Sequence, residues 1–338
     1  MGAVERIDED KSAILQVSPT RASARTTGIS ILALLILLIV PPFAKNFVVF
    51  QMTMLLIYGL AVLALNILTG GSGQFSLGQS AFYAIGAYGT AMMMEHLNIG
   101  YALSLPAAGI LCFGIGFLFG QPALRLSGVY LALATFALAT AMPQLLKLVL
   151  EQWTGGVQGL VVTKPDAPFG LPMSQDMWLY YFTLIVTLTI YIFSVNLLRS
   201  RSGRAFLAIR DNEIAASAMG VNVALYKTLA FGVSAGITGV AGGLGAIAVQ
   251  FVAPDSYTIV LAISLFLGMV VGGVGWLPGS FVGAAFIIFV PNMAEAISKG
   301  LSGAVFGALL FLVIFLVPGG AREIGEIADR LAGKIRKG

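Results

Sequence analysis

Residues 69–89 read TGGSGQFSLGQSAFYAIGAYG, and the first half of this stretch is polar although the chain around it is apolar. Between Gly70 and Ser80 there are four glycines, three serines, two glutamines and no charged residue. Glycine weakens a helix, and the polar side chains need hydrogen-bond partners. Irregular backbone at membrane depth is tolerated only where it is buried in protein or lines a wet cavity. The run therefore predicts an interruption between two helices, placed inside the protein or beside a cavity.

The composition of the whole chain is typical of a membrane protein. Of the 338 residues, 58% are hydrophobic and 10% are charged, whereas a soluble domain carries about 25% charged residues. Most of the chain is therefore expected to face lipid. Cys112 is the only cysteine, so an internal disulfide is excluded and we expect a packed thiol. His96 is the only histidine and has no partner at ligand spacing, so we expect no bound metal.

Ten stretches are apolar and long enough for helices that cross a bilayer, which takes about 20 residues each. They are residues 27–44, 47–68, 78–97, 101–121, 126–148, 177–198, 224–250, 256–275, 277–294 and 301–319. We predict an all-α fold, a polytopic transmembrane helical bundle of about ten spans with Gly-interrupted segments that are broken or re-entrant. The domains expected are a cytoplasmic tail at 1–26, a transmembrane domain at 27–320 and a basic cytoplasmic tail at 321–338. Small residues four positions apart, such as Gly268 with Gly272, predict close approach of helix backbones.

The distribution of positive charge predicts the orientation in the membrane. With ten spans both termini lie on one side, and 14 of the 19 Lys and Arg residues fall in tails or loops on that side. Lys45, Lys147, Lys164 and Lys299 fall on the opposite side. Because positively charged loops remain in the cytoplasm, we expect both termini to be cytoplasmic.

Several functional classes are disfavoured by what the sequence lacks. No charged residue lies near the centre of a predicted span, which disfavours a proton-coupled carrier and leaves sodium coupling through backbone carbonyls open. There is no GxxxxGK[ST] motif for a nucleotide, and His96 at a membrane edge leaves no set of residues for Ser/His/Asp catalysis. We therefore expect a protein that is not an enzyme, binds no cofactor and takes energy for any active transport from a partner.

The longest predicted cytoplasmic loop, residues 199–227, reads RSRSGRAFLAIRDNEIAASAMGVNVALYK. It begins with basic residues, and Asp211 is suited to cap a short helix whose first turn carries Glu213 and which ends at Gly220. This helix either lies on lipid at the interface or docks into a groove of a partner protein. Its apolar face is mostly alanine and has no aromatic anchor after Phe206, which favours docking.

The residues of this loop also resemble a known motif. Residues 213–220, EIAASAMG, resemble the Glu-Ala-Ala…Gly loop with which ABC importer permeases dock on their ATPase subunit. GRAFLAIRDNEIAASAMGVNVALYKTLAFGVSAGITGVAGGL at 203–244 and NILTGGSGQFSLGQSAFYAIGAYG at 66–89 are similar to branched-chain amino-acid permeases of the LivM type. The same family is resembled by LSGVYLALATFALATAMPQLL at 126–146, WTGGVQGL at 153–160 and GGVGWLPGSFVGAAF at 272–286.

This resemblance implies a membrane-spanning permease subunit of an ATP-driven importer in the bacterial inner membrane. It implies translocation of branched-chain amino acids by alternating access, with urea, short amides or another small polar solute as the alternative. The implied partners are two cytoplasmic ATP-binding subunits that use the ATP, a second LivH-like permease, a periplasmic solute-binding protein and membrane lipid, and no nucleic acid. The coupling loop at 199–222 is expected to contact the ATPase through Arg204, Arg210, Asp211, Glu213, Ala215, Ala216 and Gly220.

The polar run then becomes a candidate for the substrate pathway. A zwitterion needs donors for its carboxylate and acceptors for its ammonium, and a helix beginning near residues 77–80 would point its N-terminus at the carboxylate. We expect the pathway to be lined by Gly70, Gly71, Gly73, Gln74, Ser76, Gly78, Gln79 and Ser80. A second run at 272–279 begins in a similar way, which suggests a repeat around a pathway; alternatively, both runs are tight turns between spans.

Other functions are compatible with the residues alone. A channel or facilitator for a small polar solute would show flux without an ATPase. A sodium-coupled carrier would follow a sodium gradient and survive ATP depletion. A scaffold that anchors a cytoplasmic enzyme would show no solute flux in vesicles.

Overall fold

A computed structural model describes residues 37–297, except 124–125, 127, 150 and 169–172, together with Gly307 and Gly320. The chain divides into two units, Met1–Lys45 and Asn46–Gly338. The first unit contains the short 3-10 helix η1 (Pro41–Phe43). The tails predicted at 1–26 and 321–338, nearly all of the predicted span at 301–319 and most of that at 27–44 lie outside the described residues.

The second unit consists of long helices joined by short segments. They are α3 (Asn46–Asn66), the π-helical turn η2 (Ile67–Gly71), α4 (Gln79–Glu95), α5 (Tyr101–Ala123), α6 (Val129–Leu148), α7 (Glu151–Thr154), η3 (Gly156–Gln158), β1 (Leu160–Val161), α8 (Gln175–Arg199), α9 (Arg201–Asp211), α10 (Glu213–Ala218), α11 (Val223–Val249), β2 (Phe251–Val252), η5 (Pro254–Tyr257), α12 (Ile259–Gly272) and α13 (Gly279–Ile297). The all-α class predicted from the sequence is confirmed.

Six segments within the described residues are long and apolar enough to cross a membrane. They are Asn46–Gly71, Tyr101–Pro122, Val129–Leu148, Gln175–Arg199, Val223–Val249 and Pro254–Gly272, and each coincides with a predicted span. The predicted spans at 78–97 and 277–294 correspond to α4, which has 17 residues, and to α13, whose apolar part is Gly279–Met293. A polytopic bundle is therefore confirmed, while the count of about ten spans stays a prediction.

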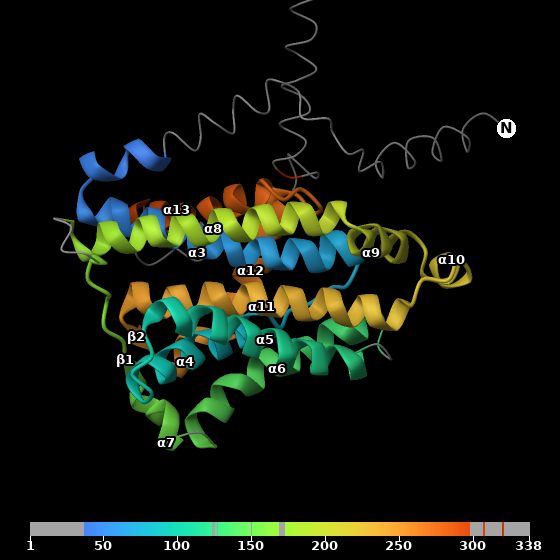
Figure 1. The fold of residues 1–338 in the computed structure, drawn as a ribbon, viewed down its shortest axis with the longest axis horizontal. Coiled ribbons are helices and arrows are strands. Elements are labelled where there is room, and N and C mark those ends of the chain that lie inside the picture. Colours follow the sequence, from blue (N-terminus) through green and yellow to red (C-terminus); the bar gives the residue numbers. More distant parts are fainter. Residues whose placement is uncertain are drawn as a thin grey trace, which may run out of the picture. The chain divides into compact units, whose positions relative to one another are not determined.

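Helix α11 lies at the centre of this bundle. Its most apolar window is 83% buried within the protein, more than that of any other candidate span in the described residues. It contacts α4 and α5 on one side and α3 on the other, and α8, α12 and α13 lie on the α3 side (Figure 1). Because neighbours surround it, α11 can be apolar on every face without exposing that surface to water.

The two ends of the bundle carry different structures. At one end α8 continues into α9 and α10, which lead back to α11 (Figure 1). At the other end α7 lies near the antiparallel pair of β1 and β2, in which Leu160 is opposite Val252 and Val161 is opposite Phe251. The long loop predicted at 199–227 therefore lies at the opposite end from the connection between α6 and α8.

Glycines allow the central helices to approach closely. A Cβ atom added at Gly86 of α4 would overlap the backbone of Gly239 in α11, and one added at Gly116 of α5 would overlap Ala235. Cys112 is fully buried against Gly239, so the expected packed thiol is confirmed. The close approach predicted from the small-residue stripes is therefore present between α11 and both neighbours.

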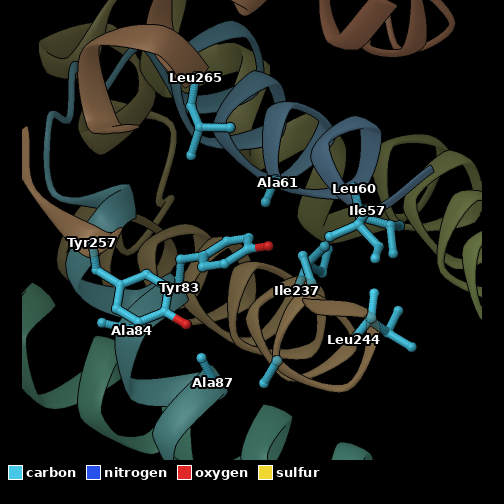
Figure 2. Packing of buried hydrophobic residues seen from close by; sticks show 14 of the residues in the cluster. Ile57, Leu60, Ala61, Tyr83, Ala84, Ala87, Ile237, Leu244, Tyr257 and Leu265 are labelled. Atoms are coloured by element: carbon cyan, nitrogen blue, oxygen red, sulfur yellow. The ribbon is translucent and has the colours of Figure 1, made fainter. Parts of the chain in front are cut away.

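A cluster of aromatic side chains fills the middle of the bundle. Tyr83 of α4 lies between Tyr58 of α3, at 6.3 Å between ring centroids, and Tyr257 of η5, at 5.8 Å. Figure 2 shows Tyr83 extending towards Ala61 of α3 beside the aliphatic side chains around Ile237 of α11. These contacts join α3, α4, α11 and η5 in one continuous core.

We predict that Gly116→Leu destabilises the bundle and that Gly114→Leu on the same helix does not. A side chain at Gly116 meets Ala235 of α11, and overpacking of this kind costs about 1–3 kcal/mol. A Cβ at Gly114 meets nothing within 4 Å. The measurement is the unfolding midpoint of each purified variant in detergent; equal midpoints for the two variants would contradict the assigned packing of α5 on α11.

Candidate functional site

Helix α9 forms a platform that is fixed to the end of the bundle. Ser200 caps its N-terminus by accepting a hydrogen bond from the Gly203 backbone N–H at 3.4 Å. Phe206 and Ile209 are buried on its inner face, and Phe206 packs edge-on against Tyr226 of α11 at 6.2 Å between centroids. The basic beginning of the predicted coupling loop is therefore a helix in its own right, which the sequence analysis did not predict.

Helix α10 follows α9 after a single residue. Its N-cap is Asn212, whose Oδ1 accepts from the Ala215 N–H at 2.9 Å, so the prediction that Asp211 caps this helix was wrong. Asn212 has an extended backbone, as an N-cap requires, whereas Asp211 is still the last residue of α9. Glu213 stands in the first turn as predicted.

The end of α10 follows the prediction. The Gly220 N–H donates to the Ser217 carbonyl at 3.0 Å, and the Val221 N–H donates to the Ala216 carbonyl at 3.1 Å. This pattern and the φ of +84° at Gly220 define a Schellman C-terminus, which glycine adopts without strain.

The surface of α10 is open to a partner. Ala216 is the one buried residue between Asp211 and Gly220, and Ala215 is exposed. Ile214 and Met219 are 81% and 85% exposed. A short helix that presents apolar side chains outside the bundle therefore has a contact surface that the described residues leave exposed.

The first half of the polar run lies against α9. We name residues 70–78 the first glycine segment. Gly70 and Gly71 are buried in the π-helical turn that ends α3, and Gly73 has a φ of +73°. A Cβ on Gly73 would lie 3.0 Å from the Cγ of Arg210, so this backbone rests directly on the arginine side chain.

The second half of the run enters the bundle. Ser76 is buried, and its Oγ accepts from the Gly78 N–H at 3.2 Å. Gly78 packs on Thr135 of α6, where a Cβ would meet the threonine Cβ at 3.1 Å. Gln79 is the first residue of α4, which confirms a helix beginning near residues 77–80. Ser80 is fully buried, and its hydroxyl makes no hydrogen bond within the described residues.

Gln79 joins α4 to α11. Its Nε2 donates to Ser234 Oγ at 2.8 Å, and its Oε1 accepts from Thr238 Oγ1 at 2.7 Å. Ser234 in turn donates to the Ala64 carbonyl of α3 at 2.8 Å. In this structure Gln79 therefore takes part in the packing of three helices, and its place in a substrate pathway stays a prediction.

Arg210 connects the coupling loop to the first glycine segment. Its Nη1 donates to the Gly70 carbonyl at 2.8 Å, while Nη2 and Nε donate to Asp211 Oδ1 at 3.1 and 3.2 Å. The arginine side chain is 19% exposed. A hydrogen bond from a charged donor contributes about 1.5–3 kcal/mol, so this contact is among the stronger single bonds at this end of the bundle.

A second connection runs through Lys227 of α11. Its Nζ donates to Glu213 Oε2 at 2.5 Å, and its backbone carbonyl accepts from Gln74 Nε2 at 3.1 Å. Because Glu213 is 52% exposed, this ion pair is screened by water and contributes at most about 1 kcal/mol. The Gln74 bond links the first glycine segment to the start of α11.

Asn66 joins the two glycine-rich runs. We name residues 272–279 the second glycine segment. Asn66 Oδ1 accepts from the Gly275 N–H at 2.6 Å, and its Nδ2 lies within hydrogen-bond distance of the Gly273 carbonyl, the Trp276 carbonyl and Ser280 Oγ at 3.1–3.3 Å. A Cβ added at Gly70 would lie 2.5 Å from the Gly275 nitrogen. The resemblance between the two runs therefore corresponds to direct contact in the fold.

Predicted pathway and coupling residues meet in one cavity. A cavity of about 240 Å³ beside α10 is lined by residues that include Gly73, Gln74, Arg210, Asp211 and Glu213. Ala215, Ala216, Gly220 and the exposed Arg204 of α9 do not line it. Asn66 is not among the site residues predicted from the sequence, although it is an isolated amide in an apolar stretch, four positions before Gly70.

A further cavity lies at the opposite end of the bundle. It measures about 330 Å³ and is lined by the end of α4 and the loop after β1, including Glu95, Tyr101, Val162 and Asp166. Between the two cavities, α4 is buried from Gln79 to Tyr88 except for the half-buried Ile85. The middle of α4 is thus packed against neighbouring helices between the two cavities.

Known proteins with similar sequences are membrane permeases, in agreement with the apolar helical bundle. Residues 47–314 match the family described as branched-chain amino acid transport system / permease component. The high-affinity branched-chain amino acid transport system permease protein LivM of Escherichia coli (strain K12) is 31% identical over 333 residues, covering 91% of this chain and 78% of the relative. LivM of Salmonella typhimurium is 31% identical over 291 residues, covering 79% and 68%. No solved structure matches the chain.

A more distant similarity is to LivH of Escherichia coli (strain K12), at 30% identity over 151 residues that cover 44% of this chain and 46% of the relative. The fold and the site define an all-α polytopic integral membrane protein in which the short helix α10 carries exposed apolar side chains. The chain belongs to the family of branched-chain amino acid transport permease components.

We predict that Asn66→Leu loosens the second glycine segment. The substitution leaves the Gly275 N–H without its acceptor, and a buried unpaired group costs about 1–3 kcal/mol. The Gly273 and Trp276 carbonyls lose one donor each and keep their backbone partners, the Trp276 and Gly279 N–H groups. In a background with Trp153→Phe and Trp178→Phe, emission from Trp276 should shift to the red and become more sensitive to acrylamide. Asn292→Leu, at an exposed position of α13, is the control. Unchanged Trp276 emission in Asn66→Leu would show that Asn66 does not hold this segment.

Proposed function

We propose that this chain is the membrane-spanning permease subunit of an ATP-driven importer, and that it translocates branched-chain amino acids by alternating access. Family membership supports the permease role, and the names of the LivM relatives favour branched-chain amino acids over urea or short amides. The proposed energy coupling rests on one observation: α10 is a short exposed helix that is held at the end of α9. No covalent chemistry is required of this chain.

The proposal extends to the partners of this chain. Two cytoplasmic ATP-binding subunits use the ATP, and one of them contacts α10 and the neighbouring residues of the coupling loop. A second, LivH-like permease completes the pathway, and a periplasmic solute-binding protein delivers the substrate. The similarity to LivH of Escherichia coli supports pairing between related permeases. This chain itself holds no cofactor and no metal.

The proposed topology is about ten spans in the bacterial inner membrane with both termini in the cytoplasm. Within the described residues, the end of the bundle that carries α9 and α10 holds Arg199, Arg201, Arg204 and Arg210, while the opposite end holds Lys147 and Lys164. This charge difference supports a cytoplasmic α10. The glycine segments are then interruptions at the cytoplasmic ends of their helices.

The first glycine segment forms the cytoplasmic end of the proposed pathway. Ser72, Gly73, Gln74 and Phe75 line the cavity beside α10. Gly73 and Phe75 are exposed, whereas Gln74 is buried and hydrogen-bonded to the Lys227 carbonyl. A substrate that leaves the bundle here would pass residues that respond to the ATPase. This placement supports a role in release more than a role in selecting the substrate.

Substitution in α10 should separate coupling from folding. Glu213→Arg or Gly220→Trp is expected to abolish ATP-driven uptake and to weaken co-purification of the ATPase, while membrane insertion stays normal. Glu213→Arg also reverses the pair with Lys227, and Gly220→Trp places a side chain where φ is +84°. Glu151→Arg, an exposed reversal at the other end of the bundle, is the control. Undiminished association of the ATPase with both α10 variants would refute the docking role.

Gln74→Leu is predicted to impair uptake without releasing the ATPase. The substitution removes the bond to the Lys227 carbonyl and an amide from the cavity, and a lost hydrogen bond of this kind costs about 0.5–1.5 kcal/mol. Uptake in vesicles and ATPase co-purification are measured together. Wild-type uptake by the variant would remove Gln74 from the pathway.

A further inference from the structure

We propose that Arg210 is a positioning residue that transmits movement of α10 to the two glycine segments. This inference rests on the proposed function, because it assumes that a partner acts on α10. It assigns to Arg210 a mechanical connection inside the chain, in place of the contact with the ATPase that the sequence suggested for it.

The connection begins with a short and stiff link between α10 and Arg210. Asn212 is the single residue between α9 and α10, and it is hydrogen-bonded in both directions. Its N–H donates to the Ala208 carbonyl at 3.0 Å, and its Oδ1 accepts from the Ala215 N–H at 2.9 Å. Asp211 fixes the guanidinium through two contacts at 3.1 and 3.2 Å. A displacement of α10 therefore reaches the end of α9 without a flexible linker.

The next step joins Arg210 to the first glycine segment. The Gly70 carbonyl lies in the last turn of η2. The Leu68 and Thr69 carbonyls before it accept from backbone N–H groups, whereas the Gly70 carbonyl accepts from Arg210 Nη1 at 2.8 Å. The backbone of Gly73 rests on the stem of the same side chain. Arg210 thus both bonds to the segment and supports it.

The last step carries the connection to the second glycine segment. Gly70 touches the backbone of Gly275, and a Cβ at Gly275 would lie 4.0 Å from Arg210 Nη1. Asn66 binds three backbone groups of the second segment and lies one turn before Gly70. Movement of Arg210 is therefore passed to the ends of both α3 and α12.

The test compares Arg210→Ala with Arg201→Ala in the complete transporter reconstituted in vesicles. Arg201 is an exposed arginine of the same helix, so both variants lose one positive charge. Arg210→Ala should keep ATPase co-purification and ATP hydrolysis but lower the substrate moved per ATP by about tenfold, the loss expected for one charge-assisted hydrogen bond. Arg210→Lys, which keeps the charge but lacks the forked donor, should recover part of this ratio.

A covalent link provides a second, independent test. A Cβ at Gly73 would lie 3.5 Å from the Cβ of Arg210, within the range for a disulfide. The double variant Gly73→Cys with Arg210→Cys is made in a Cys112→Ala background. When reduced, it should move little substrate per ATP. When oxidised, it should move most of the substrate per ATP that wild type moves. The single variants, under the same oxidation, provide the reference.

The outcomes separate this inference from the proposed function. If wild-type protein shows no ATP-driven uptake, the proposed function itself is wrong. If wild type is coupled and Arg210→Ala moves as much substrate per ATP, only the role of Arg210 is wrong. Loss of the ATPase from Arg210→Ala would show a docking residue and overturn the proposal. The proposal for Arg210 is also overturned if the disulfide forms but the substrate moved per ATP does not rise, provided that Gly73→Cys alone moves as much substrate per ATP as wild type.

Discussion

Backbone groups at the ends of membrane helices need partners, and this requirement explains the arrangement around α9 and α10. Where α3 and α12 end, their last carbonyls have no partner within the helix. Two side chains supplement the backbone hydrogen bonds here: Arg210 donates to the Gly70 carbonyl, and Asn66 accepts from the Gly275 N–H and adds a second donor to the Gly273 carbonyl. Glycine is required at position 70 because a Cβ there would lie 2.5 Å from the Gly275 nitrogen, and it is favoured at position 275 by a φ of +82°. Packing, hydrogen bonding and the proposed transmission of movement therefore depend on the same few atoms.

The same use of glycine explains why one apolar helix can occupy the centre. Without a hydrophobic driving force between helices in lipid, association depends on close van der Waals contact and hydrogen bonds. Gly239 and Gly86 bring α11 and α4 into backbone contact, and Gln79 adds hydrogen bonds to Ser234 and Thr238. The polar residues of α4 and α11 therefore fix the register of helices whose surfaces are otherwise uniform.

Much of the fold could be predicted from the sequence, because long apolar stretches and terminating glycines are local signals. The ends of α4 and α10 fall where the polar run and Gly220 indicate. The cap at Asn212 was missed because Asp211 and Asn212 are both good N-caps, and only the length of α9 decides between them. The pairing of Asn66 with Gly275 could not be predicted, since it joins residues 209 positions apart. The pathway lining proposed for the polar run stays a prediction; the division of the run between α9 and the interior of the bundle depends on contacts with distant residues, such as Arg210 and Ser234, that local sequence does not reveal.

The packed layer between the two cavities has a consequence for the cell. Phe82, Tyr83 and Tyr88 close the space along α4, and no acidic or basic side chain lies near the middle of the described spans. Ions crossing such a layer would have to shed their hydration without compensation, which costs several kcal/mol or more. The buried part of α4 in this conformation therefore opposes the leak of ions, which would help to preserve the membrane potential on which a cell depends.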